Sequence, residues 1–281
     1  MKDFIALTKP GLVMMVVLTT CIGFYLGSIG PFDWLLLIHT LIGTSLSGGG
    51  SLALNQFIER DRDATMHRTQ KRPLPSGRLK PHQALWFGVG ITIFGITYLA
   101  LLVNVLSCLV TISITASYLF LYTPLKQRTT LSTVIGAIPG ALPPVTGWVA
   151  VRNEIGLESG ILFTIMFLWQ LPHALALAWM YRDDYARAGF QLLPMVDPDG
   201  RVTSTQILIN CLALTAVSLT PTIIGLTGIL YFFVALGAGL GFLGFAVHLT
   251  ITRTSASARK LFFASLLFLL VQFVTMAIDK V

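Results

Sequence analysis

Three oxygen-bearing side chains recur every four residues between positions 55 and 63. They are Asn55, Glu59 and Asp63, and in a helix this spacing places them along one face over about 12 Å. Proteins usually hold Mg²⁺, a hard cation, with one or two carboxylates together with phosphate oxygens and water. The stripe therefore predicts a magnesium site at the end of a helix.

Basic residues follow this stripe closely. Four of them are Arg68, Lys71, Arg72 and Arg78. Guanidinium forks and ammonium groups beside a metal are what a diphosphate requires. The alternative is a solvated helix end with surface ion pairs. The apolar run Leu52–Leu54 directly before Asn55 favours the site, because it places the start of the stripe at membrane depth.

A second acidic group, with cations beside it, comes later in the chain. Asp183 and Asp184 are followed by Arg187, and we expect the two carboxylates to act in catalysis, with Asp184 also a metal ligand. A third segment supplies Tyr122, Lys126 and Arg128 as further anion-binding candidates. Two simpler explanations stay open: an Asp183–Arg187 ion pair worth a few tenths of a kcal/mol, and loop cations that only set topology.

His173 stands inside an apolar segment, directly after Pro172. It lies about 15 Å of helix rise from Asp183, too far to touch an anion held near the acidic groups. A histidine in such a place could hydrogen-bond a neighbouring helix, ligate iron or act as a base. The residues alone leave these three roles open.

The composition indicates the class of protein that positions these residues. The 281-residue chain is 54% hydrophobic and 11% charged, with a mean hydropathy of +0.78, whereas soluble domains carry about 25% charged residues. A water-soluble protein of this length could not hide so much apolar surface. The three cysteines have no C-x-x-C spacing, so neither zinc nor a disulfide framework is indicated. We expect an all-α, polytopic membrane protein.

Nine apolar segments are long enough to cross the roughly 30 Å hydrocarbon core. They lie near residues 11–28, 34–57, 84–103, 105–123, 131–151, 160–181, 205–225, 228–250 and 260–278. With nine spans, 17 of the 19 Lys and Arg residues fall on one side. The positive-inside rule then places the N-terminus and the acidic groups in the cytoplasm. The net charge of +7 is explained by these loops and needs no nucleic acid.

Small residues and prolines mark two of the spans. The runs 47–51 and 136–141 are rich in glycine, serine and alanine, which lets backbones approach closely or leaves room for a substrate. Pro143 and Pro144 predict a break in the fifth span. Acidic groups, cations and an apolar bundle together describe a substrate with a diphosphate head and a long apolar tail. The chemistry indicated is ionisation of an allylic diphosphate, with Mg²⁺ and cations stabilising the departing charge.

Several motifs in chain order resemble the UbiA superfamily of intramembrane prenyltransferases, and within it the heme O synthases (protoheme IX farnesyltransferases). They are the stretch 55–78, Tyr122–Thr129, Gly136–Trp148, Trp169–His173 and Asp183–Gly189. The resemblance covers most of the chain. It implies a single domain over residues 1–281, nine helices around a central cavity, and dependence on Mg²⁺ held by Asn55, Glu59, Asp63 and Asp184. Glu59 stands where the superfamily pattern has Asp.

The resemblance also implies the substrates and the surroundings. A farnesyl group would pass from farnesyl diphosphate to a vinyl carbon of heme B, with water addition, and His173 is the candidate to face the heme. Heme propionates would need cations as well, so the basic residues could bind either the diphosphate or the propionates. The location implied is the bacterial inner membrane, with a heme A synthase or a terminal oxidase assembly as partner. Two other functions compete with this one: a related prenyltransferase acting on an aromatic quinone precursor, and a transporter. Transporters tend to show internal repeats with charges near the midplane, and none is evident here.

Overall fold

The computed structural model describes residues 1–281, which fold into helices with no β-strand. Nine helical spans are long and apolar enough to cross a membrane: Pro10–Gly27 (α2), Trp34–Asp63 (α3), Pro81–Leu102 (α4), Val105–Leu125 (α5, η1 and α6), Ser132–Arg152 (α7 and α8), Leu157–Met180 (α9), Arg201–Ile223 (α12 and α13), Ile229–Thr252 (α14) and Ser255–Ile278 (α15). The predicted all-α membrane fold and the count of nine are confirmed, with ends that differ by a few residues.

Helix α3 is the longest element and carries the predicted acidic stripe. It begins at Trp34, where the Asp33 carboxylate accepts a hydrogen bond from the Leu36 N–H, and this caps a free donor of the first turn. It continues past the apolar part of its span and ends at Asp63. The stripe is therefore helical along its whole length, as its four-residue spacing requires.

Two spans depart from regular α-helix. The fourth consists of α5 (Val105–Ala116), a π-helical turn η1 (Ser117–Tyr122) and α6 (Thr123–Leu125). The fifth divides into α7 (Ser132–Ala141) and α8 (Pro143–Arg152), because Pro143 lacks the N–H that would continue the helical hydrogen bonds. The predicted break is confirmed. Helix α9, by contrast, stays helical through Pro172.

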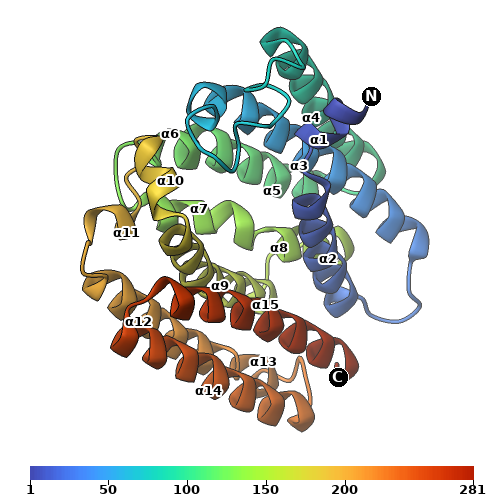
Figure 1. The fold of residues 1–281 in the computed structure, drawn as a ribbon. Helices are drawn as coiled ribbons and strands as arrows, with labels where there is room; N and C mark the ends of the chain where they lie inside the picture. Colours follow the sequence, from blue (N-terminus) through green and yellow to red (C-terminus); the bar gives the residue numbers. More distant parts are fainter.

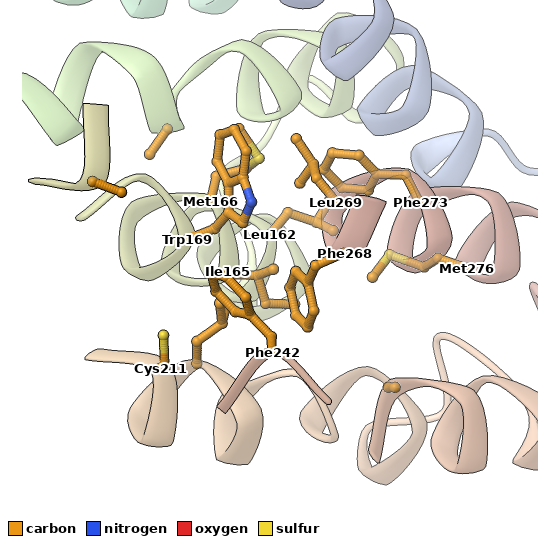
Figure 2. Close-up of a cluster of buried hydrophobic side chains, with 14 of the residues drawn as sticks. Leu162, Ile165, Met166, Trp169, Cys211, Phe242, Phe268, Leu269, Phe273 and Met276 are labelled. Atoms are coloured by element: carbon orange, nitrogen blue, oxygen red, sulfur yellow. The ribbon is translucent and has the colours of Figure 1, made fainter. Parts of the chain in front are cut away.

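The bundle is held by a large apolar core on one side and by close helix contacts on the other. Leu162, Ile165, Phe242 and Phe268 lie in the core that α9, α12, α14 and α15 share (Figure 2). Between α3 and α4 the backbones nearly touch, since a Cβ atom on Gly50 would lie 2.1 Å from the Thr92 hydroxyl. The glycine-rich run in α3 thus allows close packing, as expected.

Three short helices lie outside the spans: α1 (Lys2–Leu7), α10 (Arg182–Arg187) and α11 (Leu193–Val196). The seventh span itself divides into α12 (Arg201–Val217) and α13 (Thr220–Ile223). Helices α6, α10 and α11 lie together at one edge of the bundle (Figure 1), and the Gln191 N–H donates to the Lys126 carbonyl there. The segments that hold the predicted site residues therefore meet at one end of the helices.

Candidate active site

A cavity of about 650 Å³ lies at the centre of the bundle, between α2, α3, α5, η1, α7, α9 and α15. Most of its lining is apolar, and the polar exceptions include Tyr122, Gln170 and His173. Leu12 and Met15 of α2 and Leu266 of α15 also line it, and each is exposed. The cavity is therefore not closed by packing along α2 and α15.

Two ion pairs stand at one end of this cavity. Arg72 donates to an Asp63 oxygen at 2.7 Å, and Lys126 donates to Glu59 Oε1 at 2.9 Å. Both carboxylates are buried. The Lys126 ammonium lies 5.1 Å from the centre of the Tyr122 ring, which lines the cavity. Segments far apart in the sequence thus meet where the cavity ends. We call Lys9, Asn55, Glu59, Asp63, Arg72 and Lys126 the charged mouth.

Lys9 completes the charged mouth from α2. Its Nζ lies 3.4 Å from Asn55 Oδ1, and its backbone has a φ of 47°, a left-handed conformation that costs energy for a residue with a Cβ. Burial and the nearby Arg72 cation lower the pKa of Lys9 to about 7, against the attraction of Glu59 and Asp63. A cation held in this way is favourable only where an anion is to be bound.

Lys126 remains a cation despite its burial. Burial alone would lower its pKa, but the Tyr122 hydroxyl and the Glu59 carboxylate outweigh burial and raise the pKa above its ordinary value. With all its side chains ionised, the charged mouth contains three cations and two carboxylates. This excess positive charge in a partly buried place attracts an anionic group strongly, because the local dielectric constant is low.

The π-helical turn η1 orients Asn55. The Asn55 Nδ2 donates to Thr123 Oγ1 at 3.2 Å, and that hydroxyl donates to the Tyr118 carbonyl at 2.8 Å. The amide oxygen of Asn55 is left facing Lys9. Turns of π-helix occur often at functional sites, and this one also places Tyr118 and Tyr122 in the cavity wall.

The stripe of α3 fits a divalent metal. Asp63 Oδ1 is buried and has no hydrogen-bond partner, and Asn55 Oδ1 has only the long contact with Lys9. A buried, unpaired carboxylate oxygen is costly, and Mg²⁺ coordination would satisfy it. The donor set of two carboxylates and one amide oxygen is of the kind that Mg²⁺ prefers.

Asp184 does not share this stripe. Its oxygens accept from the N–H groups of His67 and Arg68 at 3.4 and 3.3 Å and pair with the Arg187 guanidinium. Asp184 thus ties α10 to the loop after α3. The role of Asp184 as a metal ligand stays a prediction, because these contacts occupy its oxygens just as ion pairs occupy one oxygen each of Glu59 and Asp63.

The predicted cations divide into those at the mouth and those away from it. Arg68 lies on the rim, with its guanidinium 5.3 Å from the Tyr181 ring and an amino group donating to the Tyr185 hydroxyl. Four predicted residues are not brought to the mouth. The Asp183 side chain is 89% exposed and lies near only Arg182, and Arg78 pairs with Asp3. Lys71 and Arg128 are exposed and form no ion pair. Their charges face solvent, which agrees with the alternative that loop cations only set the membrane topology.

The opposite wall of the cavity is aromatic and holds His173. The imidazole is stacked between Trp169 of α9 and Phe262 of α15, with ring centres 4.8 and 4.6 Å away. Its Nδ1 lies 2.8 Å from Ser265 Oγ. His173 is therefore hydrogen-bonded to a neighbouring span, the first of its three predicted roles, and it also lines the cavity. The roles of iron ligand and base stay predictions. We call Trp169, Gln170, His173 and Phe262 the deep wall.

Sequence reasoning missed several residues of the site. Lys9 counted only as a topology residue, although a lysine directly before the Pro10 that starts a span is a signal for an interfacial cation. Gln170 lies within the Trp169–His173 motif, which gives it no role, and Tyr118 and Ser265 carry no such signal, because each is a common residue within an apolar span. Only the packing of η1, α9 and α15 reveals them.

Comparison with known proteins identifies the family of the chain. The profile of the UbiA prenyltransferase family matches residues 16–270. The protoheme IX farnesyltransferase of Solibacter usitatus is 47% identical, covering all of this chain and 99% of its own, and that of Aquifex aeolicus is 41% identical, covering all of this chain and 96% of its own.

Two solved structures share the fold at low sequence identity. A structure described as digeranylgeranylglyceryl phosphate synthase has a TM-score of 0.84 at 16% identity, covering 99% of this chain and 97% of its own. A UbiA homolog from Archaeoglobus fulgidus bound to DMAPP and Mg²⁺ has a TM-score of 0.72 at 14% identity, covering 98% and 99%. The profile match and the identities are decisive: the chain belongs to the UbiA prenyltransferase family.

Proposed function

We propose that this chain transfers a farnesyl group from farnesyl diphosphate to a vinyl carbon of heme B, with water addition, to give heme O and diphosphate. The observation that carries the proposal is a charged mouth at one end of an apolar cavity whose opposite wall presents His173. Relatives that are 37–47% identical over the whole chain are protoheme IX farnesyltransferases.

A metal ion would add to the positive charge at the mouth. Mg²⁺ held by Asn55, Glu59 and Asp63 would add two positive charges to those of Arg72 and Lys126, and a bound diphosphate would favour the charged form of Lys9, whose pKa burial lowers to about 7. Bound there, Mg²⁺ would stabilise the charge that develops on the leaving diphosphate. A metal-bound neighbour in the same family supports this dependence on Mg²⁺.

The basic residues act on the diphosphate itself. Arg72 and Lys126 pair with the two carboxylates in the absence of substrate, and both are free to donate to phosphate oxygens once the metal has taken over those carboxylates. Lys9 adds a third donor, and Arg68 closes the rim. Hydrogen bonds of this charge-assisted kind favour departure of the leaving group.

The farnesyl tail and the acceptor occupy the apolar part of the cavity. Tyr118 and Tyr122 lie in the wall beside the mouth, where their ring faces would stabilise an allylic cation. The heme lies toward the deep wall, with His173 facing it. Residues 1–281 act as one domain in this scheme. The gap in the packing along α2 and α15 gives both apolar substrates a route of entry.

The loop charges support one orientation of the protein in its membrane. We place the protein in the bacterial inner membrane with its N-terminus and charged mouth on the cytoplasmic side, because 17 of the 19 Lys and Arg residues lie on that side. A membrane enzyme that modifies heme O further, such as a heme A synthase, or a terminal oxidase assembly, would receive the product.

The test is a reconstituted reaction. The purified full-length protein in lipid nanodiscs is incubated with farnesyl diphosphate and either heme B or an aromatic carboxylic acid, with and without Mg²⁺. We expect a Mg²⁺-dependent product from heme B that is heavier by a farnesyl group and a hydroxyl group, measured by mass spectrometry. Prenylation of the aromatic acid, with heme B unchanged, would contradict the proposal.

A further inference from the structure

The hydrogen bond of His173 has a direction that its partner determines. Ser265 Oγ lies 2.6 Å from the Phe262 carbonyl, to which it donates, and 2.8 Å from His173 Nδ1. A serine hydroxyl has one proton, and the carbonyl takes it. Nδ1 must therefore carry the proton in the other bond and donate to Ser265 Oγ. In the neutral imidazole, Nε2 is then left with a free lone pair.

The imidazole is also held in one orientation. Its two faces lie against Trp169 and Phe262, and Trp169 Nε1 donates to the Ser265 carbonyl at 2.7 Å. Ser265 therefore fixes both rings of α9, one through its hydroxyl and one through its backbone. His173 lines the cavity, and no protein atom makes a hydrogen bond with its Nε2.

A second unpartnered nitrogen lies one helical turn away. Gln170 lines the same cavity, but its Nε2 has neither accessible surface nor a hydrogen-bond partner, so a water in the cavity does not reach it. A Cβ atom on Gly140 would lie 2.1 Å from Gln170 Oε1, so only a glycine in α7 admits the amide in this position.

We propose that His173 binds the water molecule that completes the reaction, with His173 Nε2 as its proton acceptor and Ser265 as the positioning residue that fixes the tautomer. The inference rests on the proposed function, because it concerns the water added to heme. A water molecule can donate one hydrogen bond to the free lone pair of Nε2, which lies on a residue of the cavity wall.

In farnesyl transfer and in water addition, each bond that forms is matched by a bond that breaks. The vinyl π electrons form the bond to farnesyl C1 as diphosphate leaves with the electrons of its C–O bond, and positive charge develops on the vinyl carbon attached to the porphyrin ring. A lone pair of the water oxygen forms a bond to that carbon, and one water proton moves to His173 Nε2. If no water is held there, the cation instead loses a proton from the new methylene group and becomes an alkene that is one water lighter.

The test measures how the product divides between these two outcomes. His173→Gln and Ser265→Ala are compared with wild type and with the control Ser113→Ala, a lipid-exposed serine that bonds its own helix backbone. We expect the ratio of hydrated product to alkene to fall about 100-fold in His173→Gln and about tenfold in Ser265→Ala, with no change in the control. An unchanged ratio in both variants would overturn the inference.

Two further readouts keep this result separate from the proposed function. The proposed function fails if no farnesylated porphyrin forms in the wild type, whereas the inference concerns only the ratio between two farnesylated products. The ¹⁵N signals of labelled histidine should show the Nδ1–H tautomer of His173 in the wild type and a mixture of tautomers in Ser265→Ala. An Nε2–H tautomer in the wild type, or a heme absorbance band that shifts in His173→Gln as it would on loss of an iron ligand, would contradict the inference.

Discussion

The charged mouth gathers side chains from α3, the loop after it, the start of α2 and the end of α6, whereas the deep wall is made mostly by one stretch of α9. Glu59 and Asp63 of α3 pair with Lys126 and Arg72, and Lys9 joins them from the start of α2. The deep wall has no formal charge, and its only fixed polar contacts are to Ser265 of α15. This difference indicates two tasks. The mouth binds an anionic group, and the wall positions the acceptor.

The largest expected effect is at the metal stripe. Asp63→Ala removes the carboxylate whose Oδ1 has no hydrogen-bond partner. The metal ion that would stabilise the charge on the departing diphosphate then loses a ligand. We expect kcat/KM to fall about 100- to 1,000-fold, as when one group that stabilises developing charge is removed. The control is Asp61→Ala, because Asp61 is exposed two residues away. Full turnover by a correctly inserted Asp63→Ala protein would remove Asp63 from the mechanism.

The next effect is on stability. Lys126→Met leaves Glu59 buried without its cation, and breaking a buried pair in this way costs about 3–5 kcal/mol. Adding Glu59→Gln should restore much of the lost stability without restoring activity. Thermal unfolding in detergent, for the two single variants and the double variant, measures the coupling. Additive effects would show that the two side chains do not depend on each other.

A smaller effect is expected at Lys9, which meets the stripe only through a long contact. Lys9→Met should raise the KM for farnesyl diphosphate about tenfold, the equivalent of about 1.4 kcal/mol, because it removes one of three cations at the mouth. The value of kcat should change less. Lys2→Met, an exposed lysine on the same side, should leave KM unchanged. Equal KM values for the two variants would place Lys9 outside the diphosphate site.

The smallest expected effect separates two adjacent carboxylates. Asp183→Ala should change activity by no more than about twofold, since its side chain is exposed and away from the mouth. Asp184→Ala should do more damage, because it releases the loop at His67 and Arg68. Steady-state rates of the two variants decide this. A large loss in Asp183→Ala would return that residue to the catalytic set.

Much of this arrangement could be predicted from the sequence, for physical reasons that differ between the two ends of the cavity. The nine spans follow from hydropathy and charge asymmetry, and the stripe on α3 follows from a four-residue spacing. Both signals are local. The motif resemblance indicated Tyr122 and Lys126 as well.

The pairings themselves could not be predicted. Whether Asp184 turns toward a metal or toward the N–H groups of the loop depends on how α10 docks, and no local pattern encodes that. The same holds for Ser265, a residue 92 positions from His173 within an ordinary apolar span. Lys9 shows the intermediate case: its position before Pro10 was visible, but its contact with Asn55 depends on the packing of α2 against α3.

The most direct test of the division between mouth and wall is to titrate Asp63→Ala and His173→Ala separately with farnesyl diphosphate, in the presence of Mg²⁺, and with heme B. Asp63→Ala should lose the Mg²⁺-dependent part of farnesyl diphosphate affinity and bind heme as the wild type does. His173→Ala opens a gap between Trp169 and Phe262, so it should weaken heme binding and leave farnesyl diphosphate affinity nearly unchanged. If either variant lost affinity for both ligands equally, the two ends of the cavity would not have separate tasks, and the account would be contradicted.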